Sequence, residues 1–395
     1  ALLGLWMCFF WSLPAPVVAQ TSITDSTATD PMDSVEVSLL TCSPHEEIYS
    51  LYGHSAIRWH DLRSDGPVET RDIVFNWGMF NFNKPHFVLR FVFGLTDYEL
   101  GVFPYSSFWA YYKKGGSSVT EQVLNLTNDE KRSLQQALAM NQRPENKVYR
   151  YNFFYDNCST RPRDILERSI HGTVNYQDRE DYTPSYRDMV HECVRNHPWA
   201  AFGNDMLLGV KADLQTSRTE QEFLPSNLRH DFANAQIYSN GTYRPLVNEE
   251  RLSIPPGVQI IESDFPLSPT ECATILLIIS VCILLLEIRR KKTYKFWDVV
   301  LMALQGLAGC VLFVMLFSQH PTTSTNLQIL LFNPLPLFFI PSVIRRKART
   351  WWIYIMPVMI ILFLSGSIWQ CYAEGLMIVA LCLLIRIWSN YKYAK

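Results

Sequence analysis

Residues 272–292 read CATILLIISVCILLLEIRRKK, an apolar run that ends in four consecutive basic residues. The run is long enough to cross the hydrocarbon core of a bilayer as a helix. Before Pro269 the composition is polar, whereas residues 272–388 are apolar apart from two basic clusters. We therefore expect a polar domain followed by a helical membrane domain. The mean hydropathy of 0.00 and the net charge of −2 conceal this division because they average over both parts.

The apolar half divides into five segments, which predicts an all-α five-helix transmembrane domain over residues 270–390. Proline residues interrupt the third segment, and an Ala-Glu-Gly turn precedes the fifth. The predicted spans are Cys272–Ile288, Trp297–Phe317, Leu327–Ile344, Trp351–Cys371 and a last span that ends at Trp388.

The basic clusters orient these spans. Arg289–Lys292, Arg345–Arg349 and the C-terminal Lys392 and Lys395 all fall on the same side of the predicted membrane. Lys and Arg accumulate on the cytoplasmic side of membrane proteins, so the C-terminus is predicted to be cytoplasmic and the polar domain periplasmic. The expected location is the inner (cytoplasmic) membrane, with several passes.

The N-terminus has the pattern of an export signal. Residues 2–13 are apolar but too short to span a bilayer comfortably, and small residues lead up to a cleavage site after Ala19. The sequence predicts a signal peptide over residues 1–19 and a flexible tether over 20–34, with a retained anchor helix as the alternative. Residues 35–265 then form the exported domain, and a proline-rich linker follows it.

The exported domain is predicted to be α+β. Alternation and β-branched residues favour strands at Val35–Leu39, Ser55–His60, Asp72–Gly78, Phe87–Gly94, Val119–Leu126 and Lys147–Phe154. Thr127 and Glu130 have the spacing of a capping box before a helix. Asn240-Gly241 predicts a hairpin turn. Residues 171–230 are mostly helical in pattern, with Thr183-Pro184 as cap and first turn.

Residues 151–164, YNFFYDNCSTRPRD, carry the first candidate for chemistry. They predict a strand, a turn and a helix start at which Ser159 or Thr160 caps and Pro162 lies in the first turn. Cys158 then lies at or just before a helix N-terminus. Free N–H groups and the helix dipole favour a thiolate there and can bind an oxyanion.

A catalytic thiol needs an imidazole nearby in space. Residues 51–60, LYGHSAIRWH, place His54 at the start of a strand behind a glycine, and His54 is the candidate base. His191, His197 and His230 lie in helical or loop sequence, where a structural role is the simpler interpretation. The sequence has no CxxC, HExxH or glycine-rich phosphate loop, so it predicts neither a metal site nor a cofactor.

A structural role for Cys158 is the competing interpretation, because an isolated cysteine is usually a small buried apolar residue. The exported domain has three cysteines, Cys42, Cys158 and Cys193. A Cys42–Cys193 disulfide would leave Cys158 free, but cysteine parity alone does not choose the pair. The near-neutral charge argues against a nucleic-acid partner.

The order of histidine on a strand, then Asn-Cys at a helix start, resembles the permuted papain-like fold of the lecithin:retinol acyltransferase and NlpC/P60 superfamily. More closely, the chain resembles the Lnb-type lipoprotein N-acyltransferases of Bacteroidota. The matching motifs are YGHSA at 52–56, FNWGMF at 75–80, NCSTRPRD at 157–164 and FGND at 202–205. In the membrane half they are His320-Pro321, Asn326 and Asn333-Pro334-Leu335.

This resemblance implies transfer of an acyl chain from a phospholipid to the α-amine of a diacylated lipoprotein, within the membrane and without a cofactor. Cys158 would be the nucleophile and His54 the base, oriented by Asn76 or by its rival His60. The implied substrate-binding residues are Tyr52, Arg161, Arg163, His320, Asn326 and Asn333. Arg161 and Arg163 could clamp a phosphate or could instead pair with Asp156, Asp164 or Glu167.

Two other classes of function remain open at this stage. One is a different thiol hydrolase of the envelope, either a phospholipase or an amidase of the NlpC/P60 type. The other is a non-enzymatic membrane scaffold with a structural Cys158. A lipid substrate explains a five-helix membrane domain better than a cell-wall substrate does.

Overall fold

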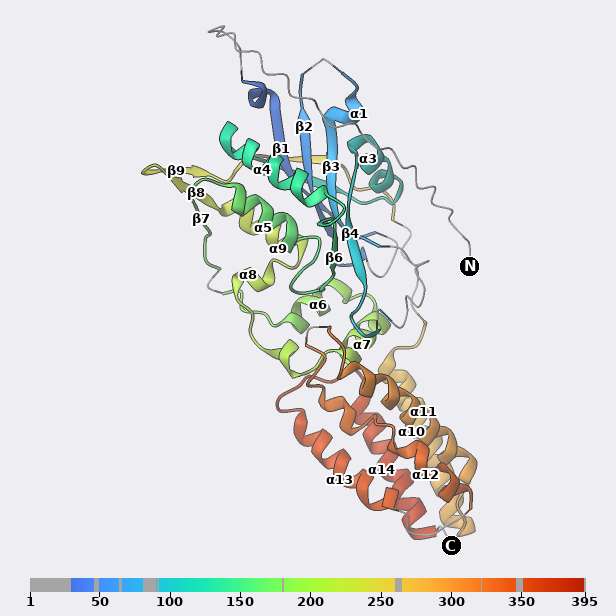
Figure 1. Ribbon diagram of the computed structural model, residues 1–395. Helices are drawn as coiled ribbons and strands as arrows, with labels where there is room; N and C mark the ends of the chain where they lie inside the picture. Colours follow the sequence, from blue (N-terminus) through green and yellow to red (C-terminus); the bar gives the residue numbers. More distant parts are fainter. Residues whose placement is uncertain are drawn as a thin grey trace.

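A seven-stranded antiparallel sheet forms the centre of the N-terminal domain in the computed structural model (Figure 1). Its strand order is β10-β5-β1-β2-β3-β4-β6. The strands are β1 (Val35–Cys42), β2 (His54–Asp61), β3 (Asp72–Met79), β4 (Asp97–Pro104), β5 (Val119–Leu124), β6 (Val148–Arg150) and β10 (Val247–Ile254). The structure describes residues 30–45, 50–63, 66–80, 90, 92–179, 181–259, 265–320, 322–345 and 351–393. The predicted signal peptide lies outside the described residues.

Helices cover both faces of this sheet, so its central strands are apolar on both sides. On one face, Leu39 and Ile57 pack against α4 (Asn128–Gln142), α5 (Thr160–Ser169) and α9 (Pro225–Asn234). On the other face, Leu40 and Ala56 pack against α3 (Tyr105–Lys114). Complete burial of a side chain such as Leu39 contributes roughly 1.5–3 kcal/mol, which fixes the strand register.

Most of the strands follow the sequence pattern. The structure confirms the strands predicted around Val35, Ser55, Asp72 and Val119, and it shortens the one predicted at Lys147–Phe154 to three residues. The strand β4 was missed. The segment Phe87–Gly94 lies largely outside the described residues, but Arg90 and Val92 are helical, so the strand prediction is wrong for those two.

The local signals at turns and helix starts had mixed outcomes. Thr127 and Glu130 form the predicted capping box of α4. Asn240-Gly241 turns between β8 (Gln236–Ser239) and β9 (Thr242–Pro245), which pair with β7 (Thr173–Asn175) in a small second sheet. The start of α6 (Tyr186–Val194) was predicted two residues too early, because Ser185 forms the capping box with Asp188 and Thr183 does not cap.

The end of the predicted tether is also ordered. Pro31–Ser34 forms a short 3-10 helix, η1, whose first turn is capped by the Asp30 side chain. Asp30 also pairs with Arg132 on α4. A tether that extends to residue 34 is therefore wrong for its last residues, because an ion pair and a cap hold them on the domain.

A layer of helices lies between the large sheet and the membrane domain (Figure 1). It consists of α6, α7 (Pro198–Leu207), the short α8 (Arg218–Gln221) and the 3-10 helix η3 (Val210–Asp213). A separate apolar cluster that includes Met189, Val194 and Phe223 holds this layer together. The predicted helical character of residues 171–230 is confirmed, with β7 as the exception.

The C-terminal domain is helical. Its helices are α10 (Pro269–Arg290), α11 (Lys295–Met315), the 3-10 turn η4 (Leu327–Leu330), α12 (Leu335–Ile344), α13 (Trp351–Gly366) and α14 (Leu376–Tyr393). By length and composition, four segments of the described chain can cross a membrane, and α13 is a shorter apolar helix. The third predicted span is broken into η4 and α12 at Asn333-Pro334. The count of five complete spans therefore stays a prediction.

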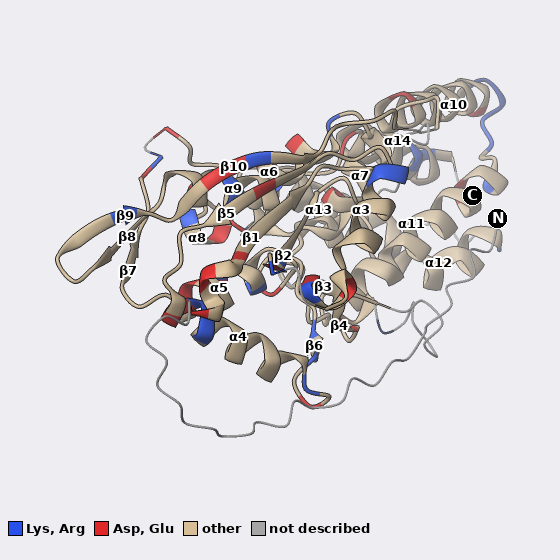
Figure 2. Cartoon of the chain, turned by 90° about the horizontal axis from the view of Figure 1, so that it is seen from above, with Lys and Arg blue, Asp and Glu red and all other residues tan. Residues whose placement is uncertain are grey.

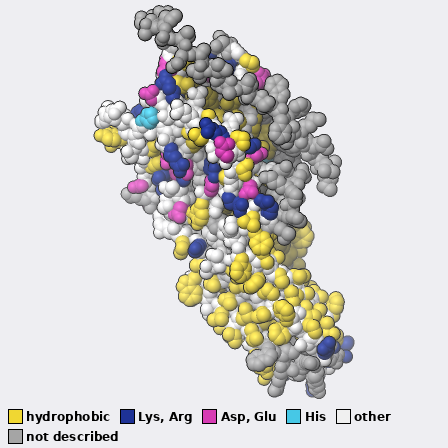
Figure 3. Space-filling model, in the orientation of Figure 1, with side chains coloured by type: hydrophobic (Ala, Val, Ile, Leu, Met, Phe, Trp, Pro, Cys, Tyr) yellow, Lys and Arg dark blue, Asp and Glu magenta, His cyan; other side chains and the backbone are white. Residues whose placement is uncertain are grey.

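The two domains have different surfaces. Side chains on the helical domain are predominantly apolar, while most visible charged residues gather over the sheet domain and a few Lys and Arg lie at the far end of the helical domain (Figure 3). The basic segment Arg289–Lys292 spans the end of α10 that points away from the sheet domain (Figures 1 and 2). The helical domain therefore has the apolar surface expected of a domain embedded in a membrane.

Inside the helical domain, the buried Arg386 of α14 joins Glu287 of α10 and Asp298 of α11. All three are less than 2% exposed. A buried charge is tolerated only when it is paired, so this cluster fixes the packing of three helices.

The orientation can be tested by labelling single cysteines in a variant whose native cysteines, including Cys158 and the exposed Cys282 and Cys371, are all replaced. Ser324 is exposed on the loop before η4, and Lys292 is exposed beyond α10. An impermeant maleimide should label Ser324→Cys from the periplasmic side of intact spheroplasts. It should label Lys292→Cys only after permeabilisation, because basic clusters stay cytoplasmic. The reverse pattern would overturn the orientation.

Candidate active site

The turn before α5 presents Cys158 at the start of a helix. The Oδ1 atom of Asn157 accepts hydrogen bonds from the backbone N–H groups of Ser159 and Thr160, at 2.8 and 3.0 Å. Thr160 Oγ1 accepts in return from the Asn157 backbone N–H at 2.8 Å. The predicted helix start is thus confirmed, but Asn157 supplies the capping oxygen and Ser159 does not. Asn157 is buried and also donates to the backbone oxygen atoms of Phe153 and Phe223, so the turn is rigid.

Gly53 shapes the turn that leads into His54. Its φ of +73° is a conformation that other residues rarely adopt, and an added Cβ would lie 2.8 Å from the backbone oxygen of Cys42. Only glycine lets the chain enter β2 this close to the end of β1. His54, the first residue of β2, therefore has a fixed position beside its β1 partner Cys42.

His54 and Cys158 are hydrogen-bonded neighbours. Both residues are partly exposed. An added Cβ on Gly78 would lie 3.8 Å from Cys158 Cβ and 3.9 Å from His54 Cε1, so β3 flanks the pair closely. The structure thus brings together two candidates that are 104 positions apart in the sequence. The residues that follow them are also in contact, because the hydroxyl oxygens of Ser55 and Ser159 are 3.2 Å apart.

The electrostatics favour a thiolate and an imidazolium. Burial raises the pKa of the Cys158 thiol. The charge of His54 lowers this pKa, and so do hydrogen bonds from His54, the Ser55 backbone N–H and Ser159. The lowering effects outweigh burial, so the pKa of Cys158 falls below its ordinary value. Burial lowers the pKa of His54, but the charge and hydrogen bond of Cys158 and the hydrogen bond of Asn76 outweigh it and raise this pKa. Opposite shifts in two contacting groups are typical of a reactive cysteine–histidine pair.

Asn76 binds one ring nitrogen of this histidine. Its Oδ1 contacts His54 Nε2. The register pairs Ile57 with Phe75, and one further step puts Asn76 opposite Ala56, two positions from His54 on the same face of the sheet. His60, the other candidate for orienting His54, lies further along β2. Its Nε2 is 4.0 Å from Asp72 Oδ2.

Comparison with known families fits this arrangement. A model of the Lnb N-terminal periplasmic domain matches residues 24–192, and a model of the Lnb transmembrane domain matches residues 260–395. The chain belongs to the Lnb family. No curated protein and no solved structure matches the chain.

In this Lnb-family chain the two candidate phosphate-binding arginines are engaged by acidic side chains. Arg161 forms a two-point ion pair with Asp156, at 2.6 and 2.7 Å, and lies over the Tyr149 ring. Arg163 is buried and bonds Asp164 and Glu222. The structure therefore supports ion pairing, the alternative that the sequence left open, over a phosphate clamp.

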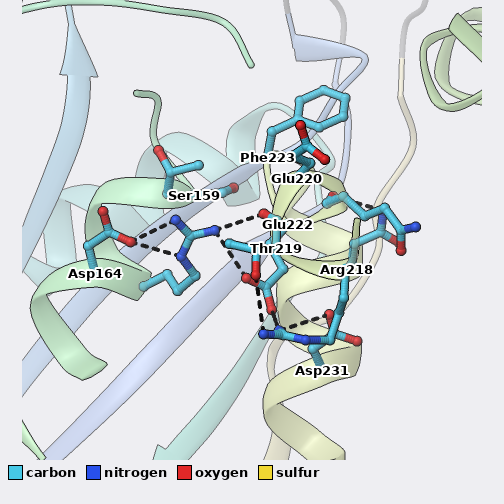
Figure 4. Close-up of polar contacts among 12 residues, drawn as sticks. Ser159, Asp164, Arg218, Thr219, Glu220, Glu222, Phe223 and Asp231 are labelled. Atoms are coloured by element: carbon cyan, nitrogen blue, oxygen red, sulfur yellow. Dashed lines mark hydrogen bonds and ion pairs between the residues drawn. The ribbon is translucent and has the colours of Figure 1, made fainter. Parts of the chain in front are cut away.

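Glu222 belongs to a larger charged cluster behind α5 (Figure 4). Arg218 pairs with Glu222 and lies 3.8 Å from Asp231, which also pairs with Arg179. Glu222 is fully buried, so its neighbouring guanidinium groups are needed to keep it in the interior. This cluster fixes α5 against α8 and α9. Glu167, the other suggested partner, bonds the Tyr176 hydroxyl instead.

The remaining predicted substrate-binding residues lie on the membrane side. Tyr52 accepts a hydrogen bond from Asn204 at 2.7 Å. His320 is partly exposed in the loop after α11. Asn326 and Asn333 are each 4% exposed, and their amides bind protein groups, so the structure does not place them on an open lipid path. Asn333 caps the broken third span, and Asn326 contacts α7.

The other cysteines of the periplasmic domain do not form a disulfide in the described chain: Cys42, Cys158 and Cys193 are all free. Burial raises the pKa of Cys193 to about 12. The low pKa of Cys158 therefore distinguishes it from Cys193 as a nucleophile. Within the described ranges, no group of three or more His, Cys, Asp or Glu could hold a metal ion.

Sequence reasoning missed several residues that shape this site. Asn157 belongs to the motif around Cys158, but its capping role requires the folded turn. The Ser55 N–H contacts the sulfur only because β2 passes the start of α5. Gln328 and Gln370 bind the C-terminal end of α7. One indication of such a role was present in the sequence, because polar amides inside or beside apolar spans are costly unless they are used.

The ion pair predicts an alkylation profile. Iodoacetamide should modify Cys158 below the pH of ~8.5 at which an ordinary thiol ionises. In His54→Ala the charge that lowers the pKa of Cys158 is gone, and burial, which raises this pKa, remains. The midpoint of the rate–pH curve should then rise.

The measurement is peptide-resolved mass spectrometry of the Cys158 peptide at each pH. His191→Ala is the matched control, because His191 pairs with Asp205 and does not contact the thiol. An unchanged midpoint in His54→Ala would show that the imidazole does not control this cysteine.

Proposed function

We propose that the protein is a membrane-bound acyltransferase that moves an acyl chain from a phospholipid, through a thioester on Cys158, to the α-amine of the lipidated N-terminal cysteine of a lipoprotein. The observation that carries the proposal is the hydrogen-bonded group Cys158, His54 and Asn76 in a domain joined to membrane-spanning helices. The two Lnb domains fit a membrane-associated protein that modifies lipoproteins.

The first half-reaction uses the thiolate as nucleophile. The Cys158 sulfur attacks the ester carbonyl of the phospholipid, a C–S bond forms, and the ester C–O bond then breaks. The His54 imidazolium donates its proton to the departing alkoxide of the lysophospholipid. The partial positive charge at the N-terminus of α5 stabilises the oxyanion of the tetrahedral intermediate. The chain then rests on Cys158 as a thioester, and His54 is neutral.

The second half-reaction reverses these roles. The lipoprotein α-amine attacks the thioester carbonyl, a C–N bond forms, and the C–S bond breaks to regenerate the thiolate. Neutral His54 accepts the proton that the amine loses. Asn76 holds the imidazole in one orientation through both steps. The chain order His54, Asn76, Cys158 is the order proposed for a permuted papain-like catalytic domain.

Membrane attachment favours a lipid-to-lipid transfer over simple hydrolysis. Both proposed substrates are held at one membrane surface, where an anchored enzyme meets them without extracting them into water. A phospholipase would need only the first half-reaction followed by water, so the fate of the thioester distinguishes the two functions. The inner membrane is the proposed location, because the lipoprotein amine and phospholipid are both available on its outer leaflet. A peptidoglycan amidase would form its thioester from a peptide and not from a phospholipid, and a scaffold with a structural Cys158 would form none.

The acyl-enzyme provides the direct test. Phospholipid alone should leave an acyl adduct on Cys158, visible by intact-mass spectrometry, that persists until a diacylated lipopeptide with a free α-amine is added. N-acetylated lipopeptide should not discharge it. Cys158→Ser should lose on the order of 10³-fold or more in transfer rate while still folding, because the hydroxyl is not ionised. Rapid hydrolysis of the adduct, without an effect of lipopeptide, would establish a phospholipase instead.

The orienting residue provides a second test. Asn76→Ala should lower the acylation rate of Cys158 by roughly 10–100-fold, because a misaligned imidazole loses the geometry that proton transfer requires. His60→Ala is the control, since His60 faces Asp72 and not His54. Single-turnover acylation measured by mass spectrometry compares the two variants. A larger loss in His60→Ala than in Asn76→Ala would reassign the orienting role.

A further inference from the structure

The C-terminal turn of α7 is held by side chains of the membrane domain. The last backbone oxygen atoms of a helix have no partner within it and must be satisfied from outside. Here three amides supply those hydrogen bonds. Gln328 donates to the Asp205 oxygen at 2.7 Å, Asn326 to the Met206 oxygen at 2.8 Å, and Gln370 to the Leu208 oxygen at 2.9 Å.

These amides form one connected unit. Asn326 Oδ1 accepts from the Gln328 backbone N–H and from Gln370 Nε2, each at 3.0 Å. Gln370 Oε1 accepts from the Leu327 N–H at 2.7 Å, and Gln328 Oε1 accepts from the Ala373 N–H at 3.1 Å. All three side chains are 4% exposed or less, so water does not compete for these bonds.

Backbone contacts reinforce the same place. The N–H groups of Gly209 and Val210 donate to the Thr322 and Thr325 oxygen atoms, each at 2.8 Å. A Cβ on Gly209 would lie 2.2 Å from the Thr325 oxygen, so only glycine permits this approach. Phe202 and Met206 of α7 also pack against the apolar core of the membrane domain. We call this set of contacts the α7 joint.

The other face of α7 reaches the candidate active site. Asn204 Nδ2 donates to the Tyr52 hydroxyl at 2.7 Å. Tyr52 packs edge-on against Phe153, with ring centroids 4.9 Å apart, and precedes Gly53 and His54 in the chain. One short helix therefore contacts both the membrane domain and the turn that carries the imidazole, in the layer between the two domains (Figure 1).

We propose that the α7 joint fixes the Cys158–His54 pair at a set place relative to the membrane. Asn326, Gln328 and Gln370 are positioning residues, and Asn204 carries the placement to the turn of His54. This proposal rests on the proposed function, because a fixed height above the bilayer matters only for a substrate held in the bilayer. Displacement of a reacting group by about 1 Å can cost on the order of 10²-fold in rate.

The test separates membrane-held from water-soluble reagents. Gln328→Leu removes one donor and one acceptor of the joint. Its rate of Cys158 acylation by phospholipid in proteoliposomes should fall at least about 10-fold. Its alkylation by iodoacetamide, including the pH profile, should stay as in the wild type, since the reagent comes from water and the pair lies within the periplasmic domain.

Gln305→Leu is the matched control. Gln305 is also a buried glutamine, 3% exposed, and donates to the Leu331 oxygen at 2.7 Å, but that contact lies within the membrane domain. Its acylation rate should stay within about 2–3-fold of the wild type, because each variant loses a bond from a buried glutamine amide to a backbone oxygen, but only Gln328→Leu loses such a bond to α7. Equal losses in the two variants, or a parallel loss of alkylation in Gln328→Leu, would overturn the proposal.

A distance measurement tests the joint even if phospholipid leaves no adduct on Cys158. Spin labels attached through unnatural amino acids at the exposed Leu252 of β10 and Phe296 of α11 report the separation of the two domains. The distance distribution should be narrow in the wild type and in Gln305→Leu and broad in Gln328→Leu. A narrow distribution in all three proteins would refute the joint. If phospholipid does not acylate Cys158 in the wild type but the distance distribution of Gln328→Leu is broad, the proposed function is refuted and the α7 joint is still supported.

Discussion

The candidate active site of this protein depends on the close approach of the start of β2 to the N-terminus of α5. At that point a strand residue, His54, meets a thiol at the end of a tightly capped turn. Two conditions make the approach possible: Gly53 lets the chain pass the Cys42 oxygen, and Asn157 closes the turn with its own side chain. The surrounding sheet, helices and ion pairs hold these two segments in place.

Burial and charge oppose each other at this contact, and charge prevails. Removing a thiolate from water is unfavourable, as is burying an imidazolium, so each group alone would be neutral. Together they stabilise each other, and the Ser55 N–H adds a hydrogen bond to the sulfur. Cys158 nevertheless remains partly exposed, as the proposed attack of its sulfur on a substrate carbonyl requires. Cys193 has no such partner, and its raised pKa shows what burial does without a counter-charge.

Features set by local sequence could be predicted, whereas features set by distant contacts could not. The apolar runs, the Thr127–Glu130 capping box and the Asn240-Gly241 turn each depend on a few neighbouring residues. The break in the third span was visible because Pro334 has no N–H group to continue a preceding helix, although Pro341 lies within α12. The strand β4 was missed because its burial alternates only weakly along Asp97–Pro104.

For the candidate site, the sequence predicted which residues take part better than it predicted their contacts. The sequence singled out His54, Asn76 and Cys158, and the structure places them in contact, although their catalytic roles stay predictions. The sequence could not decide whether Arg161 and Arg163 face a substrate or acidic neighbours. Asp156, the partner of Arg161, is near in the sequence, but Glu222, a partner of Arg163, is distant. Nor could the sequence show that Asn326 is enclosed by protein. Partners that come from separate elements appear only after folding.

Unsatisfied helix ends give a physical reason for the domain arrangement. Helix α7 ends beside the membrane domain with carbonyl groups that need donors, and the broken third span exposes backbone groups that lipid cannot satisfy. Asn326, Gln328 and Gln370 meet both needs at once, because each amide donates to α7 or accepts from the membrane domain. A single anchor helix would have no broken segment to present such amides. The several helices of this domain thus do more than hold the protein in the bilayer, because they also form the surface that receives α7 beneath the reactive cysteine domain.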